Sequence, residues 1–151
     1  MIFTLAVIIF FFDQFTKLIV IKFLQSNQSL PVIKGVLYLS LVHNRGAAFG
    51  IFKNQTLIFI IAAGFAISLI ASSLRKSSKA NLYNLALSLI LAGSAGNLID
   101  RLRFGYVIDF IDFRVWPVFN IADSAITIGA ILLGYSMLFN KTPDSKLPTP
   151  N

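Results

Sequence analysis

Residues 119–139 read FNIADSAITIGAILLGYSMLF, an apolar run that opens with a carboxylate at Asp123. At about 1.5 Å per residue, a helix of this length crosses the roughly 30 Å of hydrocarbon in a bilayer. The segment just upstream, VIDFIDF at 107–113, is also apolar and carries Asp109. Ionisable groups near hydrocarbon cost several kcal/mol unless they are paired or hydrated. Two acids in such places therefore indicate a functional site at the edge of a membrane.

The composition predicts an integral membrane protein of a single domain. Of 151 residues, 56% are hydrophobic and only 13% are charged, and the mean hydropathy is +0.79. A soluble domain usually has about 25% charged residues. We expect one membrane domain over 1–140 and a polar, Pro-rich, disordered cytoplasmic tail over 141–151. The expected membrane spans are residues 2–24, 55–74, 82–101 and 119–139.

Residue usage excludes several kinds of chemistry. The chain has no Cys, so it has no disulfide framework, no thiol nucleophile and no thiolate metal site. Its one histidine, His43, cannot form a zinc site alone, and no metal or cofactor is expected. A net charge of +7 would suggest nucleic acid in a soluble protein. In a membrane protein, Lys and Arg at span ends set topology and contact anionic lipid, so no nucleic-acid partner is expected.

The charge pattern predicts the orientation. The short segment RKSSKAN at 75–81 has three basic residues and no acid, which is typical of a cytoplasmic loop. Both termini are then cytoplasmic, and 25–54 and 102–118 lie outside. The first apolar run lacks the basic start of a cleaved signal peptide and continues past Asp13 and Lys17, so we expect it to be a retained span.

The outer segment 25–54 is more than a linker. Residues 32–42 are rich in β-branched and aliphatic side chains, with Pro31 and Gly35 as turn signals, and they predict two or three short strands. The stretch HNRGAAFGIF at 43–52 is too apolar for a solvated loop, so we expect it to lie on the helical bundle or at the membrane surface.

Two groups of polar residues share helix faces. Asp13 and Lys17 are four residues apart in the first span and can form an ion pair, with either a structural or a direct role. Asn97, Asp100 and Arg101 form one polar face at the end of the third span. For Asp100 the sequence favours a structural role, in which Arg101 and Asn97 keep it occupied and it orders Arg101.

Asp109 and Asp123 are the acids best suited to proton chemistry. Two carboxylates held close together cannot both ionise cheaply, so the pair retains a shared proton. Such a pair can take a proton from water and give one to a carbonyl, as in aspartic proteases, without Ser, Cys or metal. The alternative for the second acid is that Asn120 caps the last helix and Asp123 is only its first-turn acid. That alternative leaves the acids of VIDFIDF unexplained.

Two other function classes remain open on the residues alone. A proton-coupled transporter would use intramembrane acids as a relay, but it predicts an internal repeat, and none is visible in the sequence. A noncatalytic membrane assembly factor would use the polar residues to lock helices together. It predicts that Asp→Asn changes harm stability more than activity.

Five segments in order make the chain resemble a bacterial lipoprotein signal peptidase, signal peptidase II. They are DQFTK at 13–17, HNRGAAFG at 43–50, GNLIDR at 96–101, VIDFIDF at 107–113 and FNIADSAI at 119–126. The resemblance implies an all-α membrane fold of four transmembrane helices with a small extracytoplasmic β-cradle at about 25–54. It also implies a bacterial inner-membrane aspartyl endopeptidase that needs no metal.

The resemblance further implies a substrate and a site. The substrates are prolipoproteins in the membrane lipid, cut before a cysteine that already carries diacylglyceryl, near the extracytoplasmic face. The catalytic pair is Asp109 and Asp123. The residues implied to bind substrate or support the site are Asp13, Lys17, Asn44, Asn97, Asp100, Arg101 and Asn120.

Overall fold

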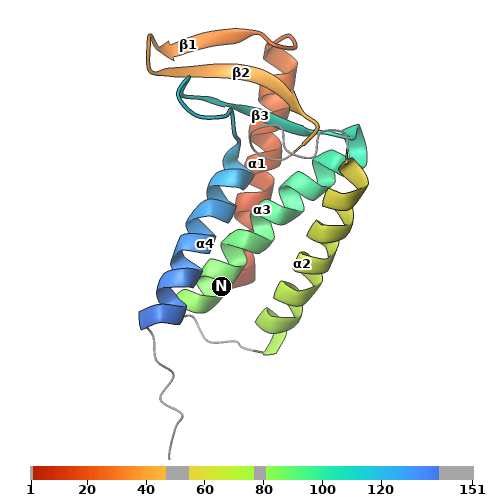
Figure 1. Cartoon of the computed structure of the whole chain (residues 1–151), viewed down its shortest axis with the longest axis vertical. Helices are drawn as coiled ribbons and strands as arrows, with labels where there is room; N and C mark the ends of the chain where they lie inside the picture. The colour runs from red at the N-terminus through yellow and green to blue at the C-terminus, as the bar shows by residue number, and fades with distance from the viewer. Residues whose placement is uncertain (1, 47–54, 77–80, 140–151) are drawn as a thin grey trace, which may run out of the picture.

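Four long apolar helices form the body of the molecule (Figure 1). The computed structural model describes residues 2–46, 55–76 and 81–139. Each helix is long and apolar enough to cross a membrane, as the sequence predicts. The predicted spans and the helices agree to within a few residues. The helices are α1 (Ile2–Phe23), α2 (Thr56–Lys76), α3 (Leu82–Phe104) and α4 (Ile121–Phe139).

A three-stranded antiparallel sheet covers one end of the helices (Figure 1). Its strands β1 (Ser29–Ile33), β2 (Leu37–Asn44) and β3 (Val107–Asp112) lie in that order. The turn between β1 and β2 contains Gly35 at φ +84°, a conformation that favours glycine. The first two strands fall where the sequence predicts them. The third strand was missed, because VIDFID carries two acids and is buried on both faces instead of alternating.

Helix α3 is the centre of the bundle and contacts the other three helices. Small residues make this possible: a Cβ at Gly93 would collide with the carbonyl oxygen of Ala122 in α4, and one at Gly96 would meet the Asp13 carboxylate of α1. Close backbone approach at small residues is the usual way in which membrane helices pack. It brings the polar end of α3 against α1 and α4.

The sheet is fixed to the bundle by an apolar cluster of Val20, Leu24, Leu41, Ile108 and Phe110. These residues join the end of α1 to β2 and β3, so β3 lies directly over the polar ends of the helices. The outer helix faces carry exposed large apolar side chains, as expected for contact with lipid. Most of the HNRGAAFGIF stretch and the whole tail lie outside the described residues, so their predicted placements stay predictions.

Candidate active site

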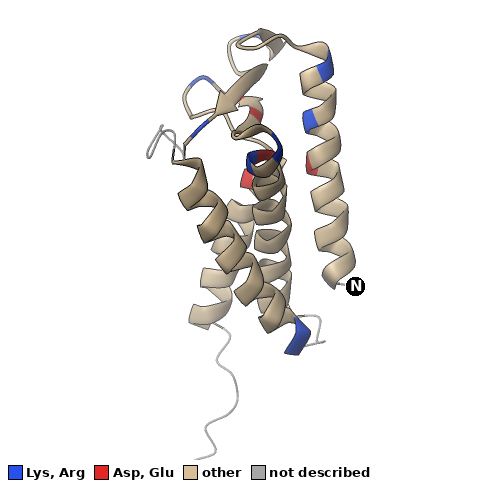
Figure 2. Ribbon diagram, turned by 90° about the vertical axis from the view of Figure 1, so that its right-hand side faces the viewer, with Lys and Arg blue, Asp and Glu red and all other residues tan. Residues whose placement is uncertain are grey.

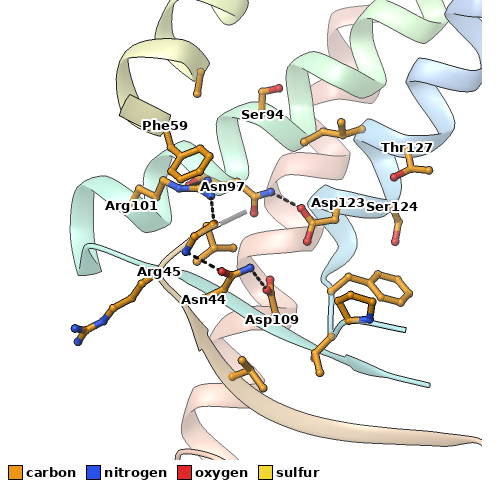
Figure 3. A pocket seen from close by; sticks show the side chains of 18 of the residues that line it. Asn44, Arg45, Phe59, Ser94, Asn97, Arg101, Asp109, Asp123, Ser124 and Thr127 are labelled. Atoms are coloured by element: carbon orange, nitrogen blue, oxygen red, sulfur yellow. Dashed lines mark hydrogen bonds between the residues drawn. The ribbon is translucent and has the colours of Figure 1, made fainter. Parts of the chain in front are cut away.

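Asn120 joins the two acids that the sequence selects, Asp109 and Asp123, whose own positions are shown in Figure 3. Its side-chain Nδ2 donates to Asp109 Oδ1 at 2.7 Å, and its backbone N donates to Asp123 Oδ2 at 3.2 Å. Asp109 comes from β3 and Asp123 from the first turn of α4. Both acids line the same cavity. The arrangement brings two carboxylates from separate elements to one place, which is what shared proton chemistry requires.

The first turn of α4 has a reciprocal cap. The Asp123 backbone N donates to Asn120 Oδ1 at 2.8 Å, while Asp123 Oδ2 accepts from the Asn120 backbone N. This is the geometry of a capping box, here with Asn and Asp. Asn120 therefore caps α4 and Asp123 is an acid of its first turn, as the alternative interpretation of the sequence predicts. It does not use the whole carboxylate, because Oδ1 of Asp123 accepts from Asn97 Nδ2 at 2.8 Å.

Asp109 is 1% exposed and has an unusual acidity. Burial, followed by the negative charge of Asp123, raises its pKa from 3.8 to about 7. Hydrogen bonds from Asn44 and Asn120 and the charge of Lys17 act in the opposite direction. A carboxyl with this pKa exchanges its proton near neutral pH, which suits a general acid or base.

Asn44 and Arg101 hold the chain that leaves β2 (Figure 3). Asn44 Nδ2 donates to Asp109 Oδ2 at 2.8 Å, and its Oδ1 accepts from the Gly46 backbone N at 2.9 Å. Arg101 Nη2 donates to the Gly46 carbonyl at 3.2 Å, and its guanidinium lies 4.8 Å from the centre of the Phe59 ring in α2. These contacts tie the end of β2 to both α2 and α3 beside the acids.

Below the acids lies a buried charge cluster of Asp13, Lys17 and Asp100. Lys17 Nζ is 2.8 Å from Asp13 Oδ2 and 2.8 Å from Asp100 Oδ2, and all three side chains are at most 2% exposed. The predicted Asp13–Lys17 pair is therefore present. The expected Asp100–Arg101 partnership was wrong: no ion pair joins them within the described part of the chain, and Asp100 pairs with Lys17. Successive residues of a helix point in different directions.

The two carboxylates of this cluster also accept hydrogen bonds from backbone N–H groups. Asp13 Oδ1 accepts from the Ala122 N in the first turn of α4, and Asp100 Oδ2 accepts from the Ile108 N in β3. Gln14, which the sequence analysis did not select, donates to Asp13, to Asp100 and to the Gly96 carbonyl. The one available signal for Gln14 was its position beside Asp13 in DQFTK. The cluster therefore fixes both elements that carry the acids.

Asp112 belongs to a different group of residues. Residues three apart in a strand point to opposite faces, so Asp112 and Asp109 separate. Asp112 accepts from the Ser40 Oγ at 2.7 Å and from the Arg114 N at 2.8 Å. The Arg114 guanidinium lies 3.8 Å from the centre of the Tyr38 ring. This group closes the turn after β3 and lies apart from the acids.

A cavity of about 1160 Å³ opens beside the two acids. It is lined by the polar side chains of Asp109, Asp123, Asn44 and Arg101 and by apolar side chains of α2, of α4 and of the segment 116–119 (Figure 3). Polar, acid-bearing side chains and apolar side chains therefore face one cavity. Phe59 and the segment 116–119 could not be selected from the sequence, because apolar side chains in an apolar chain give no separate signal. Among the described residues, no group of three His, Cys, Asp or Glu side chains is placed to hold a metal ion.

Comparisons with known proteins point to one family. A family model described as signal peptidase (SPase) II matches residues 5–139. A lipoprotein signal peptidase of Caldanaerobacter subterraneus is 52% identical over 130 residues, which are 85% of this chain and 90% of that protein. One from Halothermothrix orenii is 44% identical, over 88% of this chain and 92% of that protein. A solved bacterial membrane enzyme superposes with a TM-score of 0.85 at 34% identity, over 96% of this chain and 92% of that one.

Proposed function

The chain belongs to the signal peptidase II family of aspartic peptidases, which remove signal peptides from prolipoproteins, and from this premise we propose that Asp109 and Asp123 are its catalytic pair. The observation that carries the proposal is the Asn120 bridge, which holds both carboxylates at one cavity. Family membership decides against the transporter and the assembly factor that the residues alone left open.

The two acids differ in a way that suggests separate roles. Asp109 is almost fully buried and its raised pKa of about 7 lets it begin the reaction protonated. Asp123 lies at the N-terminus of α4, where the helix dipole favours a negative charge. In the proposed cycle Asp123 takes a proton from water as the water oxygen attacks the scissile carbonyl, and Asp109 gives its proton to the carbonyl oxygen. The proton on Asp123 then passes to the departing amine, and the collapsing intermediate returns the other proton to Asp109.

The cavity suits a substrate that is part peptide and part lipid. Its apolar lining includes Phe59, Ala62 and Ala63 of α2 together with Ile126 and Ile128 of α4. Ile128 is 52% exposed, so this side faces the surroundings of the bundle. We assign this apolar lining to the acyl chains of a diacylglyceryl cysteine that arrives laterally from the bilayer. The scissile bond just before that cysteine then lies beside the two acids.

The proposed orientation of the protein in the membrane is supported by what lies at the two ends of the helical bundle. The sheet and the acids lie at one end of the bundle, and the basic C-terminal turn of α2 lies at the other (Figures 1 and 2). A cytoplasmic 75–81 segment therefore puts the active site near the extracytoplasmic face of the inner membrane, with both termini in the cytoplasm. A reporter fused at Ser77 should behave as cytoplasmic. Labelling of that position from outside would overturn the orientation.

The test of the proposed function is cleavage by purified protein. The wild type should release the signal peptide from a diacylglyceryl-modified prolipoprotein, while Asp109→Asn and Asp123→Asn should each be inactive, because an amide cannot exchange the proton. The same prolipoprotein without the lipid is the matched control substrate and should be cut at least tenfold more slowly. Cleavage by either folded Asn variant would refute the catalytic pair. Equal cleavage of both substrates would refute the role assigned to the apolar lining of the cavity.

A further inference from the structure

Lys17 makes one contact that an ion pair does not require. Besides its two carboxylate partners, its Nζ donates to Asn97 Oδ1 at 3.1 Å. An ammonium has three donors and no acceptor, so all three are used here. The atom of Asn97 that faces Lys17 must therefore be the oxygen, since the amide nitrogen would present hydrogens to hydrogens. A buried lysine thus fixes which way round this carboxamide lies.

The orientation of the Asn97 carboxamide determines which hydrogen-bond donors face the two acids. With Oδ1 toward Lys17, its Nδ2 points to Asp123 Oδ1 and donates at 2.8 Å. The same Oδ1 also accepts from Asn120 Nδ2 at 3.1 Å, and that nitrogen donates to Asp109 Oδ1 at 2.7 Å. A reversed Asn97 would set its oxygen against the Asp123 carboxylate and its nitrogen against both the ammonium and the Asn120 amide.

We propose that Lys17 is a positioning residue of the peptidase, whose ammonium orients the Asn97 carboxamide and, through it, delivers one amide donor to each catalytic aspartate. This inference rests on the proposed assignment of Asp109 and Asp123. Lys17 is 2% exposed and contacts Asn97 from α1. The described residues that line the cavity do not include Lys17, so it does not act on substrate, and its charge contributes less to the pKa of Asp109 than burial, Asp123 and Asn44 do.

The competing role for Lys17 is structural, in which it only neutralises Asp13 and Asp100 so that α1 and α3 can pack. Replacing Lys17 alone would leave two buried carboxylates without their cation, which costs several kcal/mol and would confuse the two roles. The double variant Asp13→Asn/Lys17→Met avoids this, because the cluster keeps its formal charge of one negative unit. Because the wild type and the double variant carry the same cluster charge, their comparison measures the loss of the ammonium donor, and Asp13→Asn alone measures what the loss of the Asp13 carboxylate contributes.

The test measures kcat and KM for the lipidated prolipoprotein, with thermal melting of each variant as a check of folding. We expect kcat of Asp13→Asn/Lys17→Met to be at least tenfold below those of the charge-matched wild type and of Asp13→Asn, with KM changed less than twofold. Ser40→Ala breaks bonds of the separate Asp112 group without touching Lys17 or Asn97, and should lower the melting temperature while leaving kcat within twofold. In an Asn97→Leu background, the same Lys17 replacement should change kcat less than twofold.

A loss of kcat from the Lys17 replacement that is equally large in the Asn97→Leu background overturns the proposal, as does an unchanged kcat. If the double variant does not fold, Asn97→Asp decides, since it keeps Lys17 and can donate to Asp123 only while it is protonated. If the activity of that variant is lost at a pH at least one unit lower than in the wild type, the proposed donation from residue 97 to Asp123 is supported. A pH profile like that of the wild type overturns the proposal. Activity in Asp109→Asn or Asp123→Asn would instead refute the catalytic pair itself, so the two failures are distinguishable.

Discussion

Replacement of Asp109 by Asn should abolish cleavage and yet raise the stability of the protein at alkaline pH. In the folded protein the pKa of Asp109 is raised from 3.8 to about 7, chiefly by burial and then by Asp123. Between these two values the folded protein binds more protons at this carboxyl than the unfolded chain does. The free energy of unfolding of the wild type therefore falls as pH rises through that window and stays low above it.

The size of the effect can be worked out. A pKa difference from 3.8 to about 7 corresponds to about 4 kcal/mol at 1.36 kcal/mol per pKa unit. The introduced amide keeps one acceptor but turns its NH₂ toward Asn44 or Asn120, which costs about 1–2 kcal/mol. The net gain at pH 8 is about 2–3 kcal/mol, or roughly 4–12 °C in Tm. At pH 5 the gain should be less than half as large, because the wild-type carboxyl is then protonated.

Thermal melting of purified protein in detergent at pH 5 and pH 8, beside the cleavage assay, provides the measurement. Asp112→Asn is the matched control on the same strand: it weakens the contacts to Ser40 and Arg114, so it should lower Tm at both pH values and remain able to cleave. If Asp109→Asn melts below the wild type at pH 8, the inference that the ionised Asp109 carboxyl destabilises the folded protein is refuted.

Two further predictions concern the pH profile and the helix packing. Because the pKa of Asp109 is about 7 and the proposed reaction needs its proton, kcat/KM of the wild type should fall about tenfold per pH unit above that value; a plateau to pH 9 would contradict this. Gly93→Ala should lower the free energy of unfolding by about 1–3 kcal/mol and reduce cleavage, since its Cβ meets the Ala122 carbonyl and displaces the helix that carries Asp123. Gly64→Ala, whose Cβ would meet no atom of the described residues, should change neither melting nor cleavage appreciably.

Much of the fold was predictable because a bilayer leaves few solutions. Backbone groups in hydrocarbon must bond within a helix, so long apolar runs become spans, and the helix bounds follow the hydropathy closely. The strand β3 was not predictable from alternation, since β3 is covered on both faces and carries Asp109 and Asp112 within an apolar run. Its acids are what made the segment noticeable, and they are also what obscured its secondary structure.

The site was only partly predictable for a different reason. Spacing along one helix correctly paired Asp13 with Lys17, because both partners share a face. Asp100 was assigned the nearest cation in sequence, Arg101, but its partner Lys17 comes from another helix, and sequence spacing has no information on contacts between helices. The same limit hid Gln14 and the contact of Arg101 with Phe59.

The buried polar residues of this site hydrogen-bond to one another and to nearby backbone groups. Asn120 is the last residue before α4. It caps that helix and hydrogen-bonds to both acids, so the start of α4 and the assembly of the pair depend on this one residue. Asp13 binds the same turn from α1, and Asp100 binds β3 from α3. In a low dielectric such bonds are strong when complete and costly when broken. The buried charge cluster and the proposed catalytic pair are therefore parts of one hydrogen-bonded system, and hydrogen bonds from Asn44 and Asn120 offset part of the cost of burying the Asp109 carboxyl.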